Sequence, residues 1–326
     1  IYGNYIAVGR YMANITLNGS TYYTGLVDIF KTTDGGNTWS LVKSIYPHNH
    51  SELSWGTSIR FGWSTSLHNN TLVVGAPFTG YNSGSVYIYE KDQDGPDQWG
   101  HVKNVGAFLS GGDEYGWSVS LYDDWLCVGS KSHNSNYGAV YIYQRNEGGT
   151  NAWGQTQKIS PSDLVAYDWF GYSVSIYDNK LLIGKLGNIY FYELDNGTTW
   201  SEVDKFTSSD SYPYYYMGLS CSVTEQYAVS VINSHAIYLY NITSGSGSVP
   251  SGPQITLGVG STYVEQGATA DTGETVTIAI TKNVNGEIET VSSVDTNVEC
   301  AVYTITYSAT DSSGNVGTAT RTVTII

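Results

Sequence analysis

Charge is scarce in this chain. Only 13% of its 326 residues are charged, and 14 Lys and Arg stand against 29 Asp and Glu, for a formal net charge of -15 at pH 7. Nucleic acids and anionic membrane surfaces attract basic proteins, so neither is an expected partner. No apolar run approaches the roughly 18 residues of a membrane-spanning helix, and no basic segment followed by an apolar one marks a targeting signal. The sequence therefore predicts a soluble chain without a membrane span.

Recognised catalytic motifs are also lacking. The chain has no GxSxG, HExxH, P-loop or CxxC pattern, and its six histidines are scattered. His48 and His50 alternate, which would place both imidazoles on one strand face, but no third metal ligand accompanies them. We therefore expect a non-enzymatic protein that requires no cofactor.

Cysteine and methionine are rare, whereas aromatic residues are abundant. Cys127, Cys221 and Cys300 are an odd number of cysteines and cannot form a closed set of disulfides. Against 2 Met the chain has 29 Tyr and 9 Trp, with many Ser, Thr, Asn and Gly. Aromatic and β-branched side chains suit a pleated, half-buried surface, so the composition predicts an all-β fold.

Six Asn-x-Ser/Thr sequons lie in polar, turn-like contexts from which a glycan would project. They are Asn14, Asn18, Asn49, Asn69, Asn196 and Asn241. A chain so rich in Asn and Thr contains some sequons by chance. Their clustering before residue 244 and the scarcity of Lys still favour a secreted glycoprotein, located outside the cell or on its surface.

An internal repeat of 54 to 55 residues runs through the chain. Its first strand recurs as FGWSTSL (61–67), YGWSVSL (115–121) and FGYSVSI (170–176), with a weaker copy, MGLSCSV (217–223). Each copy continues with a second apolar strand and a third strand, and in the first three copies a Trp then marks a fourth. YIAVGR (5–10) supplies one further second strand. Four strands per repeat at this period predict a β-propeller of about five four-stranded blades.

The run FG, followed by LVVGAP and GSVYIY, resembles the FG-GAP repeat of integrin α-subunit propellers and related surface proteins. The resemblance covers about residues 1–243, and the best copy, 61–104, retains both the FG and the GAP residues. It implies a propeller that serves adhesion or ligand display. Many FG-GAP repeats hold calcium in a DxDxDG loop between the first two strands, where this chain has only two-residue turns.

An acidic cluster lies instead between the third and fourth strands of one blade. Asp92, Asp94 and Asp97 belong to the run DQDGPD. Two interpretations stay open, a solvated acidic turn and a calcium site. Calcium is the one cofactor that the sequence suggests.

The segment TTDGGNTW (32–39) resembles the Asp-box of sialidase-type propellers. In this turn an Asp side chain caps backbone amides and a Trp packs between blades. Sialidase chemistry would need an arginine cluster and a Tyr nucleophile. Arg10, Arg60 and Arg145 occupy no recurrent position. The motif is therefore expected to be a folding device.

Tyrosines form two kinds of cluster. Pairs recur along the predicted third strands, at Tyr87 and Tyr89, Tyr141 and Tyr143, Tyr190 and Tyr192, and Tyr238 and Tyr240. We expect these pairs to fill the space between blades, and the alternative is a surface on which sugars stack. A separate cluster is the better candidate for an exposed contact patch. It consists of Tyr212, Tyr214, Tyr215 and Tyr216.

The chain is predicted to end in a second, smaller domain. SGSGSVPSGP (244–253) has the composition of a linker. Residues 254–326 show short alternating strands, the pattern of a small β-sandwich. STYVEQGATA, YTITYSATDSSGN and RTVTI resemble bacterial-type immunoglobulin-like domains of surface proteins, which often serve as spacers or stalk modules. The predicted organisation is a propeller over 1–243, a linker and an Ig-like β-sandwich.

Both ends of the predicted propeller look incomplete. The first blade begins at its second strand, and the fifth has no recognisable fourth strand before the linker. Unpaired strand edges tend to pair with further strands. Three interpretations stay open: the missing strands come from upstream residues, the two ends close one blade together, or another subunit supplies a strand.

The function predicted from these features is that of an extracellular structural or adhesion protein. Its partners would be surface glycans or other protein subunits, the latter extending to a homopolymer or filament. The alternative is a glycan-binding, lectin-like propeller module.

Overall fold

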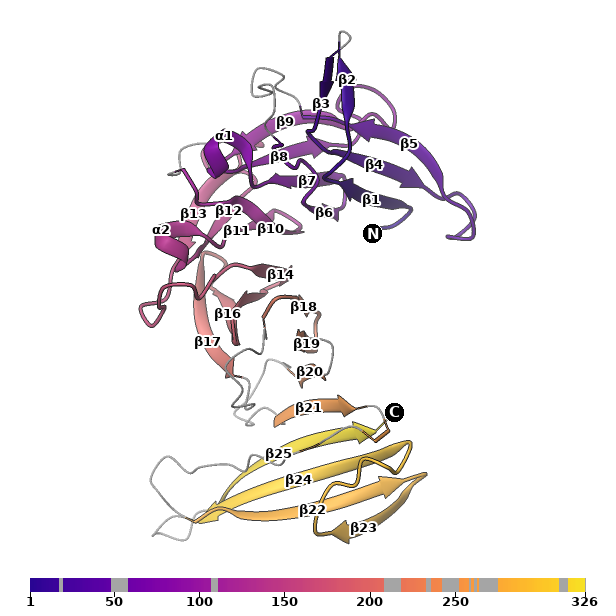
Figure 1. The fold of residues 1–326 in the computed structure, drawn as a ribbon, viewed down its shortest axis with the longest axis vertical. Coiled ribbons are helices and arrows are strands. Elements are labelled where there is room, and N and C mark those ends of the chain that lie inside the picture. The colour runs from indigo at the N-terminus through magenta and orange to yellow at the C-terminus, as the bar shows by residue number, and fades with distance from the viewer. Residues whose placement is uncertain are drawn as a thin grey trace. The chain divides into compact units, whose positions relative to one another are not determined.

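In the described residues of the computed structural model, the regular secondary structure is almost all β-strand, with two four-residue helical turns (Figure 1). It describes residues 1–17, 20–47, 58–106, 111–207, 218–232, 236–241, 252–257, 259–260, 263, 275–310 and 316–325. The chain divides into two compact units, residues 1–206 and 207–326. The predicted all-β fold class is confirmed.

Three complete blades follow one another in the first unit, each an antiparallel sheet whose strands lie in chain order. The second blade comprises β6 (Ser64–His68), β7 (Thr71–Ala76), β8 (Ser85–Glu90) and β9 (Gly100–Val105). The third comprises β10 (Tyr115–Tyr122), β11 (Trp125–Ser130), β12 (Ala139–Gln144) and β13 (Gly154–Ile159). The fourth comprises β14 (Ser173–Tyr177), β15 (Lys180–Lys185), β16 (Asn188–Asp195) and β17 (Thr199–Thr207).

The first blade has three strands in the described part of the chain. They are β1 (Tyr5–Arg10), β4 (Leu26–Lys31) and β5 (Ser40–Ile45). A small hairpin is inserted between β1 and β4, formed by β2 (Ile15–Leu17) and β3 (Ser20–Tyr22). β1 carries the sequence pattern of a second strand, so this blade presents the second to fourth strands of the repeat.

Apolar clusters fill the space between successive blades. Phe61 and Tyr87 of the second blade pack with Val27 and Ile29 of the first, and the two later junctions repeat this arrangement. The third-strand tyrosines of blades two to four are all buried, at Tyr87, Tyr89, Tyr141, Tyr143, Tyr190 and Tyr192. The predicted role of these pairs between blades is confirmed, and their rings are not available to stack on sugars. The side chains of Tyr238 and Tyr240 lie outside the described residues.

The fourth-strand tryptophans and one cysteine belong to the same interior. Trp99, Trp153 and Trp200 are at most 2% exposed. Cys127 is fully buried at a position aligned with Val73, and burial raises the pKa of its thiol. It behaves as a small apolar side chain, as the repeat alignment predicts.

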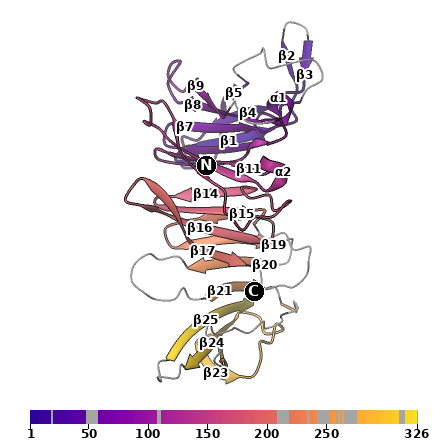
Figure 2. The same ribbon diagram turned by 90° about the vertical axis from the view of Figure 1, so that its left-hand side faces the viewer.

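The second unit contains one continuous eight-stranded sheet (Figure 2). Its first part is the fifth blade, formed by β18 (Cys221–Val223), β19 (Tyr227–Ile232), β20 (Ala236–Asn241) and β21 (Gly252–Leu257). Its second part is the Ig-like sheet, formed by β22 (Thr277–Val284), β23 (Glu287–Val291), β24 (Ala301–Thr310) and β25 (Val316–Ile325).

Strand β21 joins the two parts of this sheet. It pairs antiparallel with β20, where Tyr238 lies opposite Ile255, and parallel with β25, where Ile255 lies opposite Val323. The fifth blade thus has the fourth strand that the sequence did not reveal. This pairing also explains why the fifth blade groups with the Ig-like sheet rather than with residues 1–206. The linker over 244–253 stays a prediction, because most of it lies outside the described residues.

Candidate functional site

The FG motif forms the junctions between blades. Gly129 in β11 lies so close to the next blade that a Cβ atom there would be 2.0 Å from the carbonyl oxygen of Gly171, and Gly75 has the same relation to Gly116. Ser118 donates its hydroxyl hydrogen to the carbonyl of Gly171 at 2.8 Å. The motif residues are therefore used for packing one blade on the next, as a structural element of the repeat.

Two left-handed turns reinforce these junctions. They are α1 (Thr79–Asn82) and α2 (His133–Asn136), which connect second to third strands. In α2 three successive residues from Asn134 to Asn136 have φ between 51° and 69°, and left-handed conformation costs an ordinary residue about 1–2 kcal/mol. The Trp169 amide donates to the carbonyl of Asn136 at 3.0 Å, so the strained turn docks the next blade. The sequence did not predict these turns.

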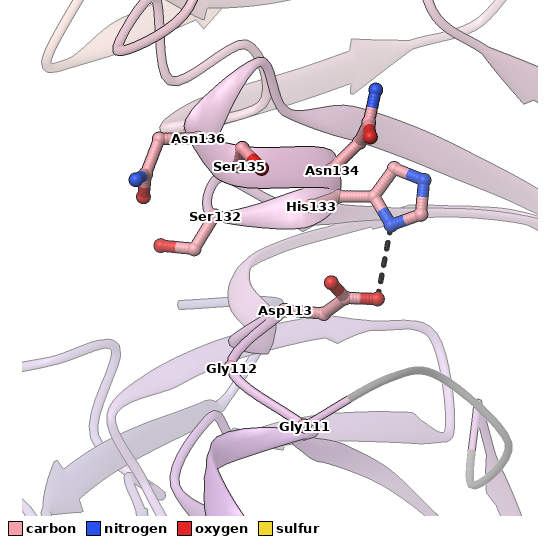
Figure 3. Close-up of a pocket in the computed structure, with 8 residues that line it drawn as sticks. All are labelled: Gly111, Gly112, Asp113, Ser132, His133, Asn134, Ser135 and Asn136. Atoms are coloured by element: carbon pink, nitrogen blue, oxygen red, sulfur yellow. Dashed lines mark hydrogen bonds and ion pairs between the residues drawn. The ribbon is translucent and has the colours of Figure 1, made fainter.

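A polar pocket of about 460 Å³ lies beside α2 (Figure 3). Gly111, Gly112 and Asp113 line one side of it, and residues 132–136 line the other. Asp113 is only 5% exposed, and its Oδ2 lies 2.9 Å from Nδ1 of His133. Asn134 and Asn136 project from opposite sides of the turn (Figure 3).

The hydrogen bonds of His133 define its tautomer. Its Nε2 lies 2.7 Å from Nζ of Lys158, and an ammonium group can only donate. Nε2 is therefore the acceptor, and the ring hydrogen sits on Nδ1, directed at Asp113. Ser132 donates to Glu114 at 3.0 Å rather than to His133, so this cluster is not a Ser-His-Asp triad. The cluster presents hydrogen-bonding groups to the pocket. Sequence reasoning missed the pocket, because its residues come from two loops without a motif.

Lysine side chains form ion pairs with two carboxylates of the predicted acidic cluster. Asp97 accepts from Lys31 at 2.8 Å and from the hydroxyl of Tyr5, and Asp92 accepts from Lys91 at 2.9 Å. These bonds hold the pKa of both carboxyl groups below its ordinary value. Asp94 is exposed.

The turn that contains this cluster has a counterpart in the next blade. Asp92 caps the backbone amide of Asp97 at 2.6 Å, and Asn146 caps that of Asn151 in the same way. An Asn in the equivalent place shows that capping needs no negative charge. Among the described residues no group of three His, Cys, Asp or Glu side chains is placed to hold a metal ion. Calcium at Asp92, Asp94 and Asp97 stays a prediction.

The Asp-box turn has the hydrogen bonds that its motif predicts. Asp34 accepts from the hydroxyl of Thr38 at 2.6 Å, from the backbone amide of Thr38 at 2.9 Å and from Thr32 at 2.8 Å. These bonds, led by that of the Thr38 side chain, lower the pKa of Asp34 to about 2. The indole of Trp39 donates to the carbonyl of Gly36. These bonds lie within the turn itself, so the motif acts as a folding device.

Some of the remaining predicted sites are exposed residues that the structure describes, and the others lie outside the described residues. Asn14, Asn69 and Asn196 are exposed, and the amide nitrogen of Asn69 donates to Asp123 at 3.0 Å. Asn241 ends β20, with its side chain outside the described residues. The remaining calls lie wholly outside them, namely Asn18, Asn49, His48, His50, Tyr212, Tyr214, Tyr215 and Tyr216.

Aromatic rings form a ladder across the blades that sequence reasoning also missed. Tyr11, Trp63, Trp117 and Tyr172 follow one another with ring centroids 4.6 to 5.4 Å apart. Three of them occupy the position after the FG pair, so the repeat itself carries the signal. Lys131 lies 3.9 Å from the Trp117 ring centroid and covers that face.

Successive four-stranded blades joined by FG motifs define a propeller-type repeat protein. The family model described as "FG-GAP repeat" matches residues 56–89, 109–143 and 153–190. The model described as "Bacterial surface protein, Ig-like domain" matches residues 249–325. The chain therefore carries FG-GAP repeats followed by a bacterial surface Ig-like domain, in the predicted order. These families indicate a surface or extracellular protein of the adhesion or structural kind, and they are typically non-enzymatic.

Three solved structures that resemble the chain are 12% to 15% identical to it. The computationally designed Ika4 protein is 12% identical over 55% of this chain and 89% of its own, with a TM-score of 0.37. Hsv2 of Kluyveromyces marxianus is 15% identical over 68% of this chain and 61% of its own, with a TM-score of 0.43. Hsv2 of Kluyveromyces lactis is 14% identical over 70% and 67%, with a TM-score of 0.42.

No curated protein matches the chain. In the parts of the chain that the structure describes, no helix is long and apolar enough to cross a membrane.

Proposed function

We propose that this chain is an extracellular adhesion or structural protein, in which the blades supply a rigid surface and the Ig-like domain a spacer or assembly contact. The observation that carries the proposal is the order of modules. Three FG-GAP repeats precede a surface Ig-like domain, and the fifth blade continues into that domain through β21. A shared strand makes this connection stiff, which suits a protein that holds a binding surface away from its anchor.

The use of the motif residues supports a scaffold rather than an enzyme. Within the described ranges, the FG glycines, the serines and the paired tyrosines serve the blade junctions. Catalysis needs a nucleophile or acid and base held against one another, and the Asp113–His133 pair has no hydroxyl partner of that kind among those residues.

The proposal includes glycans at the six sequons and contacts with other subunits, up to a homopolymer. Its test is fractionation and brief protease treatment of intact source cells, followed by mass spectrometry. We expect peptides of the blades to be released from intact cells, with glycans at exposed sequons such as Asn14 and Asn196. Recovery of the chain only from the cytosol would contradict the proposal. Electron microscopy of the native material separates single molecules from filaments.

Glycan binding is a second candidate function, and the pocket beside α2 supports it. The buried carboxylate of Asp113 offers an acceptor to the hydroxyl groups of a sugar, beside the ring of His133. A glycan array tests it with His133→Ala. Asn82→Ala, in the equivalent turn α1, is the matched control. Binding that survives His133→Ala would exclude this pocket.

Calcium at the acidic cluster is tested separately. Asp92 and Asp97 would have to leave Lys91 and Lys31 to share one ion. Calcium titration followed by NMR would then shift the signals of both carboxyl groups. Unchanged signals at millimolar calcium would exclude the site.

A further inference from the structure

Arg60 stands in a strained turn that the repeat uses in three blades. Its φ is 53°, and Glu114 and Trp169, which precede the YG and FG pairs of the next two blades, have the same φ. In each copy the amide three residues later donates to the carbonyl of this residue, at 3.0 to 3.2 Å. Ile59 and Phe61, on either side of Arg60, are buried. The position recurs although the arginine does not, and the packing of the blade fixes its backbone.

The side chain of Arg60 lies against aromatic rings. Its guanidinium carbon is 4.2 Å from the ring centre of Phe78 and 5.3 Å from that of Trp63. Trp63 belongs to the aromatic ladder, in which the ring of Trp117 follows at 4.6 Å. Aromatic neighbours orient a guanidinium and leave its N–H groups free to donate. Arg60, Trp63 and Phe78 are all half-buried, so this cluster reaches the surface.

Arg60 has no acidic partner in the described part of the chain. The other two arginines of residues 1–206 do, since Arg10 pairs with Asp28 and Arg145 pairs with Glu90. The contrast is notable because 29 Asp and Glu stand against 14 Lys and Arg in the whole sequence. A guanidinium without a counter-charge in so acidic a chain is available to an anion from outside.

The next blade shows how the repeat neutralises a charge at this position. Glu114 takes the place of Arg60 there, and Lys131 forms an ion pair with it. Lys131 stands two residues after the glycine of its second strand, and the matching residue of the second blade is Pro77. The third blade therefore supplies its own counter-charge, whereas the second blade has an uncharged residue at the matching position.

We propose that Arg60, beside Trp63 and Phe78, binds the acidic group of a carboxylated or sulfated glycan. The fork of N–H donors on a guanidinium matches the paired oxygens of a carboxylate or a sulfate. The neighbouring rings supply apolar contact to the C–H groups of the same sugar. A sugar needs only such shallow contact, whereas a protein partner binds through anchor side chains in well-packed pockets. The inference rests on the proposed surface role, and the site is separate from the pocket beside α2.

Calorimetric titration of the full chain with defined hexasaccharides tests the proposal. The probes are a hexamer of a uronic acid, a sulfated hexamer of a neutral sugar and the same neutral hexamer without sulfate. At about 0.15 M salt we expect at least one acidic probe to bind, and its preference over the other identifies the anion. The neutral hexamer should bind about tenfold more weakly or worse, because the hydrogen bonds to a charged group are lost.

Two variants at one position separate the guanidinium from its charge. Arg60→Gln removes the charge and should weaken binding of the acidic probe about ten- to a hundredfold. Arg60→Lys keeps the charge without the fork and should recover only part of that loss. Lys43→Gln, on β5, is the charge-matched control and should leave the affinity unchanged, as should His133→Ala beside α2. Thermal unfolding shows that each variant is folded.

Several results would overturn the proposal. They are failure of both acidic probes to bind, equal binding of the neutral hexamer, and an affinity that Arg60→Gln leaves unchanged or that Lys43→Gln lowers as much. Tighter binding of hexaglutamate than of either acidic sugar would assign the site to an acidic protein and contradict a glycan. Recovery of the chain only from the cytosol would instead defeat the proposed surface role and leave these affinities unaffected.

Discussion

At the scale of single residues, the repeat motif is explained by close approach of backbones. Gly75 and Gly129 are required because the next blade's carbonyl oxygen occupies the space of a Cβ atom. Ser64 and Ser118, each two residues after an FG glycine, donate to those same carbonyl groups. These motif residues are thus used in packing one blade on the next.

Replacing Gly129 by alanine tests this explanation. The new Cβ atom would meet the Gly171 carbonyl, a backbone group that cannot turn aside, and we expect about 1–3 kcal/mol of destabilisation. Urea denaturation measures the change. Gly111→Ala is the control, because its Cβ atom would have no neighbour closer than 3.5 Å. Equal stability of the two variants would refute the close approach.

The Asp-box carboxylate provides a prediction in acid. The pKa of Asp34, lowered to about 2, lies below the value of about 4 in an unfolded chain. Its hydrogen bonds therefore stabilise the turn fully above about pH 4, and this contribution is lost as pH falls through about 2. NMR titration of the carboxyl carbon should show that midpoint. Thr38→Val, which removes the hydroxyl donor, should raise it toward 4, and an unchanged midpoint would assign the shift elsewhere.

Residue-level prediction from sequence worked where the repeat constrains a side chain. The tyrosine pairs alternate with apolar residues in three copies, so their burial between blades could be predicted. Asp113 and His133 could not be predicted as neighbours, because one precedes β10 and the other follows β11 in loops that differ between copies. No local pattern reports a contact of that kind.

At the scale of elements, most strands could be predicted from alternation. β10 spans Tyr115–Tyr122, close to the predicted 115–121, whereas β6 starts only at Ser64. Gly62 and Gly116 have nearly the same left-handed φ, 84° and 83°, and β10 extends past its glycine because Tyr115 pairs with Ser130. Strand β21 was not predicted from the sequence, because it begins at the end of a Ser/Gly/Pro segment that has the composition of a linker. Its Pro253 falls where the pairing with β25 shifts register, a place where a strand tolerates proline.

Ile255→Pro tests the double pairing of β21. Proline removes a backbone donor from a strand that has neighbours on both edges, which leaves a carbonyl unpaired at a cost of about 1–3 kcal/mol. We expect faster amide exchange in both β20 and β25. Ile288→Pro, in the edge strand β23, is the control and should affect only β22 and β23. Loss of protection in β25 alone would show that the fifth blade does not depend on β21.

At the scale of the whole molecule, the two compact units predict two unfolding transitions in calorimetry. The first unit holds the junction of Gly129, and the second holds β21. Gly129→Ala should therefore lower one transition temperature and Ile255→Pro the other. A single transition that both variants lower equally would mean that the units unfold together.

The blade junctions also bear on how such a chain grows. Each of the two junctions between the second, third and fourth blades is made from a glycine, a backbone carbonyl and a hydroxyl, so the third blade has the same parts on both sides. Duplication of one repeat in the gene would therefore insert a blade whose two new contacts already exist. Copy number can therefore change by whole repeats while these contacts are kept.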